Sequence, residues 1–100
     1  MSQYRFTPQA VADLFEIWNY IAQQSPQAAD RVEDAIHAAC CLLADRPYAG
    51  RLRPDLTPLP LCFWVVRQYS NYLIVYDPET KPLQIIRILH AARNLPTILT

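Results

Sequence analysis

The spacing of apolar positions divides this chain into a helical first half and a strand-rich second half. Polar and apolar residues alternate over residues 3–6, which predicts a short first strand. Apolar side chains then recur at helical spacing over about 8–23 and 26–46. Each of these segments begins with a hydroxyl residue followed by proline, at Thr7-Pro8 and Ser25-Pro26, which is typical of a helix start. Because so little chain separates the two helices, they are expected to pack as an antiparallel pair.

Residues 47–60 interrupt this periodicity, and strands are predicted beyond them. Four prolines and Gly50, the only glycine in the chain, predict a segment without regular structure. Apolar runs at about 61–67, 70–77 and 83–90 predict three strands, the last two joined by a polar hairpin connection. The order β-α-α-β-β-β predicts one α+β domain over residues 1–100, with a small antiparallel sheet and a two-helix hairpin on one face.

The predicted sheet carries more apolar surface than two helices can cover. The second and third of the four predicted strands are apolar on both faces, as Phe63-Trp64-Val65-Val66 illustrates. Strict alternation would place Leu83, Ile85, Arg87 and Leu89 together on one side of the last strand. Since a large apolar patch is rarely left in water, we expect either the C-terminal segment or a partner chain to cover the second face.

Composition and charge limit the class of protein, its cellular compartment and the kind of partner that can be expected. Apolar residues make up 52% and charged residues 18%, values typical of a folded core. No segment has the length or the apolar character of a membrane span or signal peptide, so a cytoplasmic protein is expected. Three cysteines without CxxC spacing and only two histidines predict no metal and no cofactor. The net charge of zero is uneven, with two arginines against six carboxylates in residues 1–45 and seven basic residues against three carboxylates in 46–100. A basic sheet half favours a partner with an acidic surface.

Two groups of residues carry candidate chemistry. Arg67, Arg87 and His90 could clamp a phosphate and exchange a proton, as a metal-independent ribonuclease requires. The alternative is that Arg87 pairs with a helix carboxylate and His90 hydrogen-bonds the backbone at its strand end. The basic loop with Arg51 and Arg53 is equally consistent with a solvated salt-bridged turn and with a recognition surface.

Several segments, in order and spacing, resemble the ParE toxins of the RelE/ParE superfamily of bacterial type II toxin–antitoxin modules. They are the first-helix stretch 12–22 and the segments 47–56, 71–76 and 88–95. The resemblance implies a RelE-like fold, inhibition of DNA gyrase by binding without a cofactor, a role in plasmid stabilisation, and neutralisation by a ParD-like antitoxin in a hetero-oligomer. It does not favour catalysis, membrane association or direct nucleic-acid binding. The partner contacts expected on this interpretation are Arg51, Arg53, Phe63, Trp64, Tyr72, Tyr76, Arg87, His90 and Arg93.

Three positions depart from the pattern of the family. Cys62 stands where the family often has arginine, Ala91 where it has glycine, and Asn94 where it has aspartate. These departures keep open a degenerate toxin that only binds its antitoxin. A RelE-like messenger RNA interferase that uses Arg67, Arg87 and His90 is the other alternative. A single lysine and zero net charge favour the ParE interpretation over an enzyme that engages ribosomal RNA.

Overall fold

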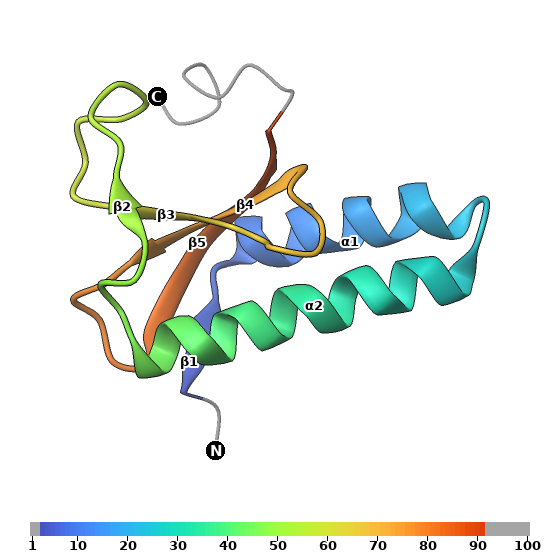
Figure 1. Cartoon of the computed structure of the whole chain (residues 1–100), viewed down its shortest axis with the longest axis horizontal. Coiled ribbons are helices and arrows are strands. Elements are labelled where there is room, and N and C mark those ends of the chain that lie inside the picture. The colour runs from blue at the N-terminus through green and yellow to red at the C-terminus, as the bar shows by residue number, and fades with distance from the viewer. Residues whose placement is uncertain (1–2, 92–100) are drawn as a thin grey trace.

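The computed structural model describes residues 3–91, and in it two antiparallel helices cover one face of a five-stranded sheet (Figure 1). The helices are α1, Pro8–Ala22, and α2, Pro26–Asp45. The strands are β1 Tyr4–Phe6, β2 Arg51–Leu52, β3 Cys62–Val65, β4 Tyr72–Asp77 and β5 Leu83–His90. Their order across the sheet is β1-β5-β4-β3-β2. The predicted α+β class with a helical hairpin on the sheet is therefore confirmed.

Both helices begin as the sequence predicts. The Thr7 hydroxyl accepts a hydrogen bond from the Ala10 amide at 3.1 Å, and the Ser25 hydroxyl accepts one from the Ala28 amide at 3.1 Å. Each cap satisfies an amide that has no partner in the first turn of its helix. The helices end within one residue of their predicted limits.

The sheet is mixed rather than wholly antiparallel. β1 runs parallel to β5, with Tyr4 opposite Leu83, whereas the other three pairs of strands are antiparallel. A two-residue strand, β2, also forms inside the segment that was predicted to lack regular structure, where Arg51 lies opposite Phe63. Neither Arg51 nor Leu52 is a proline, so both retain the amides that pairing with a neighbouring strand requires.

The prediction of strict alternation along the last strand is wrong, because β5 contains a bulge. Val75 lies opposite Arg87 while Tyr76 lies opposite Ile85, so Ile86 is the extra residue. A bulge reverses the facing of the residues that follow it. Ile85 and Ile88 consequently share the core beneath the helices, whereas Leu89 packs on the opposite face.

The second face of the sheet is covered within the chain. Phe63, Leu73, Val75 and Leu89 are all buried, and they pack with Leu61 and the partly buried Leu56 and Ile86. These apolar side chains of the second face are therefore not left in water, as was expected of a face this apolar. The C-terminal segment from residue 92 onwards lies outside the described residues, so the choice between that segment and a partner chain stays a prediction.

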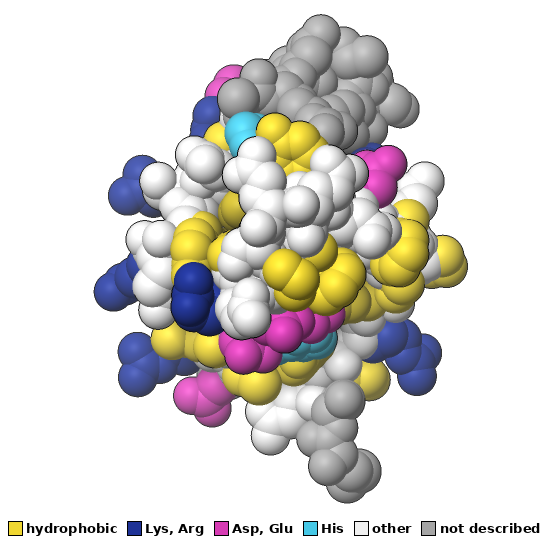
Figure 2. Space-filling view, turned by 90° about the vertical axis from the view of Figure 1, so that its right-hand side faces the viewer, with side chains coloured by type: hydrophobic (Ala, Val, Ile, Leu, Met, Phe, Trp, Pro, Cys, Tyr) yellow, Lys and Arg dark blue, Asp and Glu magenta, His cyan; other side chains and the backbone are white. Residues whose placement is uncertain are grey.

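Charged side chains of both signs lie at the helical end of the molecule. Figure 2 looks onto this end, and acidic side chains gather in its lower half while lysine and arginine side chains lie around the rim. The first half of α2 contributes Asp30, Glu33 and Asp34. One of these, Asp30, accepts a hydrogen bond from Trp18 Nε1 on α1 at 3.0 Å. The basic side chains that concern the candidate site lie instead on and beside β2 and β3.

We expect the fold to lose stability in alkali. Burial raises the pKa of Tyr4, Cys40 and Tyr76 to about 12 each, from 10.0 for the phenols and 9.0 for the thiol. A group whose pKa is higher in the folded state contributes stability below its unfolded pKa, and that contribution is lost as pH rises through the folded pKa. Stability should therefore fall between about pH 9 and 12, as measured by urea unfolding at fixed pH.

Phenylalanine variants separate this effect from general alkaline damage. Tyr76→Phe should make the alkaline fall shallower, whereas Tyr20→Phe, at a tyrosine that is 76% exposed, should leave it unchanged. Equal slopes for the wild type and Tyr76→Phe would contradict the assignment of the fall to buried groups.

Candidate partner-binding site

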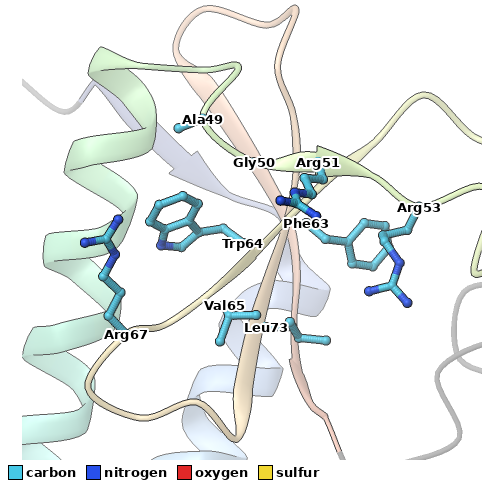
Figure 3. A pocket seen from close by; sticks show the side chains of 9 residues that line it. All are labelled: Ala49, Gly50, Arg51, Arg53, Phe63, Trp64, Val65, Arg67 and Leu73. Carbon is cyan, nitrogen blue, oxygen red and sulfur yellow. The ribbon is translucent and has the colours of Figure 1, made fainter.

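A groove of about 560 Å³, here called the edge groove, lies beside β2 and β3 (Figure 3). Its chemically distinctive lining comprises three arginines and three apolar side chains, namely Arg51, Arg53, Arg67, Phe63, Trp64 and Val65. Successive side chains of a strand point to opposite faces. Accordingly, Trp64 points towards α2 in Figure 3, whereas Phe63 points away from it.

A buried tyrosine holds the loop that forms one wall of this groove. The Tyr76 hydroxyl donates to the Pro47 carbonyl oxygen at 2.7 Å and accepts from the Gly50 amide at 2.9 Å. The Tyr48 hydroxyl adds a second tether by donating to Glu79 Oε1 at 2.6 Å. Tyr76 itself is fully buried, so it supports the site from beneath and presents no surface to a partner in this structure.

The three arginines of the groove differ in how far their charge is neutralised. Arg53 donates to both carboxylate oxygens of Asp55, at 2.9 and 2.8 Å, which raises the pKa of Arg53 and lowers that of Asp55. Arg51 pairs with no carboxylate among residues 3–91. The guanidinium carbon of Arg67 lies 5.5 Å from the ring centre of Trp64, within the range of a cation–π interaction, and Arg67 pairs with no carboxylate among residues 3–91. Arg51 and Arg67 therefore supply the unneutralised charge.

Arg87 lies away from the edge groove and pairs with Asp13 of α1. Its Nε donates to Asp13 Oδ2 at 2.7 Å and its second nitrogen to Asp13 Oδ1 at 2.9 Å, and the Ile88 amide also donates to Oδ2 at 3.0 Å. Both side chains are largely buried, at 21% and 13% exposure. The expectation that Arg87 pairs with a helix carboxylate is confirmed. This pair fastens α1 to β5 beyond the end of β1.

His90 lies at the end of β5 and packs edge-on against Tyr72, with ring centres 5.4 Å apart. Tyr72 is buried opposite His90 on β4. Arg67, Arg87 and His90 thus have three different neighbours, Trp64, Asp13 and Tyr72, and of the three only Arg67 lines the edge groove. Arg93 and Asn94 lie outside the described residues, whereas Ala91 is exposed and follows β5 directly.

Comparison with known proteins decides the family. The profile described as "ParE toxin of type II toxin-antitoxin system, parDE" matches residues 4–95. The chain belongs to the ParE toxin family. It is 37% identical to "Toxin RelE2" of Caulobacter vibrioides over 97 residues, which span 93% of this chain and 99% of that toxin. A solved structure, "Chromosomal ParDE TA system from P. aeruginosa", has the same fold, with a TM-score of 0.71 at 23% identity over 87% of this chain and 92% of that one.

The position of Cys62 in the structure explains why this ParE-family chain can depart from the family pattern there. Cys62 is buried opposite Tyr76 and belongs to the core beneath the helices. Burial is the main cause that raises the pKa of its thiol, so it behaves as a small apolar residue rather than a reactive group. An arginine at this position would have to place a charge in that core.

Sequence reasoning identified the basic loop of this ParE-family chain but missed several residues that shape the site. Val65 and Leu73 complete the groove, and Asp13 determines where Arg87 points. The signal available in the sequence for that pairing was the carboxylate of Asp13 on the predicted first helix. Among residues 3–91, no three histidine, cysteine or acidic side chains could together hold a metal ion. No helix in the same range is long and apolar enough to cross a membrane.

Proposed function

We propose that this ParE-family toxin inhibits DNA gyrase by binding it in the cytoplasm, and that a ParD-like antitoxin neutralises the toxin. One observation carries the proposal. The edge groove combines two arginines that pair with no carboxylate of the described residues, Arg51 and Arg67, with the exposed Val65 and the half-buried Trp64, a composition suited to a protein partner with acidic residues. The partner contacts proposed at this groove are Arg51, Arg53 and Trp64, whereas Phe63, at 5% exposure, lies beneath the groove surface.

The arrangement of the other candidate groups supports binding over catalysis. General acid–base chemistry needs a proton donor or acceptor within hydrogen-bond reach of the reacting atom. Phosphate clamping needs arginines that are not already neutralised. Arg87 is engaged by Asp13, and His90 lies beside Tyr72 rather than at the groove. A phosphoryl-transfer site built from Arg67, Arg87 and His90 would therefore require a different arrangement of these side chains.

A RelE-like messenger RNA interferase is the second candidate, because the relative from Caulobacter vibrioides carries the name Toxin RelE2. Controlled expression in a bacterial host separates the two. A gyrase inhibitor should stop DNA replication and give filamentous cells while bulk translation continues at first. An interferase should stop translation within minutes.

The His90→Ala variant sharpens this comparison. A general acid or base contributes about 10²–10⁴-fold to a rate, so an interferase should lose nearly all toxicity. A toxin that acts through a binding surface should lose much less. Toxicity that vanishes with His90, with replication intact throughout, would refute the gyrase proposal. Tight antitoxin binding by a non-toxic wild-type chain would indicate a degenerate toxin.

We expect the two loop arginines to contribute unequally to partner association. Arg51→Glu should slow association with the antitoxin about tenfold at low salt, because it reverses an unneutralised charge beside the groove. Arg53→Glu should have a smaller effect, since Asp55 already neutralises Arg53. Stopped-flow association at several salt concentrations measures both. Equal effects, or rates independent of salt, would contradict the proposed role of Arg51.

A further inference from the structure

The outer face of α1 carries apolar side chains that remain open to water in this structure. Val11, Phe15 and Trp18 recur at intervals of four and three residues, which places them in a row on one face of the helix, here called the α1 stripe. The buried residues of α1, Ala10 and Leu14, lie on the neighbouring face and belong to the core. Val11 is 54% exposed and Phe15 is 66% exposed, whereas Trp18 is half-buried. Single exposed apolar residues are ordinary, but a row of them on one helix face is a surface that a partner can cover.

Carboxylates of α2 border the α1 stripe. Trp18 Nε1 donates to Asp30 Oδ1 at 3.0 Å, so the stripe adjoins the side of α2 that carries Asp30. Glu33 and Asp34 come three and four residues later, which keeps them close to that side of the helix. None of the three carboxylates forms an ion pair within residues 3–91. Figure 2 shows acidic side chains gathered next to apolar ones at this end of the molecule.

The other charged side chains of these helix segments do not reverse the negative charge of this face. Arg31 directly follows Asp30, so it lies about 100° around α2 from that carboxylate. Asp13 is engaged by Arg87, and Glu16 adds a further exposed carboxylate to α1. A negatively charged face attracts basic segments and repels acidic ones. The α1 stripe therefore fits a partner whose charge is opposite to that of the partner proposed for the edge groove.

We propose that the α1 stripe and the adjoining carboxylates of α2 bind a basic, amphipathic helix of the toxin's target. The apolar side chains of that helix pack on Val11 and Phe15, and its lysines or arginines pair with Asp30 and Asp34. The identity of the target as DNA gyrase rests on the proposed function, whereas the location and chemistry of the contact rest on the exposed stripe and its charge. An amphipathic helix presents apolar side chains at intervals of three and four residues, which matches the spacing of the stripe.

A second copy of this chain is a poorer occupant of the same face. Two α1 stripes packed on each other would bring the same carboxylates together from both copies, and like charges placed opposite each other at an interface cost affinity. A partner with lysines or arginines beside its apolar side chains removes that repulsion and gains charge-assisted hydrogen bonds. Phe15 is the expected anchor, because aromatic side chains are among those that most often dominate the binding energy of an interface.

The test measures how strongly the full chain and its variants inhibit supercoiling by DNA gyrase. Phe15→Gln should raise the toxin concentration needed for half-inhibition by about thirtyfold, as expected when an interface loses a central aromatic anchor. Asp34→Lys should raise it by about tenfold, because it places a positive charge where the target helix is basic. The affinity of both variants for the ParD-like antitoxin should stay within about threefold of the wild type, which shows that the variants are folded.

Two control variants make the same chemical changes elsewhere on the same helices. Tyr20→Gln replaces an aromatic residue that is 76% exposed and lies about 140° around α1 from Phe15. Asp45→Lys reverses an exposed carboxylate about 16 Å further along α2 than Asp34, which is beyond the screening length of about 8 Å at physiological salt. Each control should change the half-inhibition concentration by less than about threefold.

Hydroxyl-radical footprinting of the wild-type chain with gyrase provides a measurement that does not depend on the variants folding. Oxidation of Phe15 should fall when gyrase binds, while oxidation of Tyr20 stays the same. Equal inhibition by the wild type and Phe15→Gln, with Phe15 still oxidised in the complex, would overturn this inference and leave inhibition of gyrase intact. A Phe15→Gln variant that loses only its affinity for the antitoxin would also overturn it. A wild-type chain that does not inhibit gyrase would overturn both this inference and the proposed function.

Discussion

Replacing Gly50 with alanine is expected to destabilise the folded chain by about 1–3 kcal/mol, the range seen when an atom is forced into a packed site. The added Cβ would stand 2.5 Å from the Tyr76 hydroxyl oxygen and 2.8 Å from the carbonyl oxygen of Phe63. Tyr76 is held by two hydrogen bonds, and Phe63 belongs to the pairing of β3 with β2. Neither atom can retreat without breaking contacts that position the loop.

Urea unfolding measures this loss, and Tyr76→Phe tests its cause. Gly50 does not have positive φ, so the expected effect is steric rather than a backbone preference for glycine. In the Tyr76→Phe background the closest contact is gone, so Gly50→Ala should destabilise the chain less than it does in the wild type. Strictly additive losses would contradict the contact with Tyr76 as the main cause. Antitoxin binding should weaken in Gly50→Ala, because the loop wall of the edge groove shifts.

Replacing Asp13 with alanine should cost about 3 kcal/mol of stability, since breaking one partner of a largely buried ion pair leaves the other charge uncompensated. Asp13 receives three hydrogen bonds, two from Arg87 and one from the Ile88 amide. The variant would leave all three donors without this acceptor at a place where α1 covers the edge of β5. Thermal and urea unfolding should both report the loss.

The matched control for this prediction is Glu16→Ala, an exposed carboxylate one turn further along α1. Its effect should stay within about 0.5 kcal/mol, as is usual for exposed surface positions. The double variant Asp13→Leu/Arg87→Met should recover much of the stability, because an apolar pair of similar volume removes the uncompensated charge. If Asp13→Ala were as mild as Glu16→Ala, the ion pair would not be what fastens α1 to β5.

The helices could be predicted from local signals, whereas parts of the sheet could not. Thr7-Pro8 and Ser25-Pro26 mark helix starts within a few residues of sequence, so no distant contact is needed to read them. The bulge at Ile86 leaves no such mark, because Ile85 and Ile86 are both apolar, as are Ile88 and Leu89, so the sequence does not show where the facing changes. The parallel pairing of β1 joins the first strand to the last, β5, so no signal near β1 in the sequence predicts it.

Some residues of the candidate site could likewise be predicted from the sequence, and others could not. The basic loop was visible in the sequence because Arg51 and Arg53 stand in a proline-rich segment without helical or strand periodicity. Trp64 was assigned to a strand, but its cation–π contact with Arg67 depends on the turn after β3. Tyr76 was expected to contact a partner, yet its hydroxyl reaches beneath the loop at Gly50. The contact between Tyr76 and Gly50 joins residues 26 positions apart and has no local signature.

The central claim is inhibition of gyrase by binding, and one reconstituted assay tests it most directly. Purified chain is added to DNA gyrase and relaxed plasmid, and separately to ribosomes programmed with messenger RNA. The account predicts that supercoiling by gyrase is blocked, that the ParD-like antitoxin restores it, and that messenger RNA stays intact. Messenger RNA cleaved at the ribosome, with supercoiling unaffected at the same toxin concentration, would contradict it.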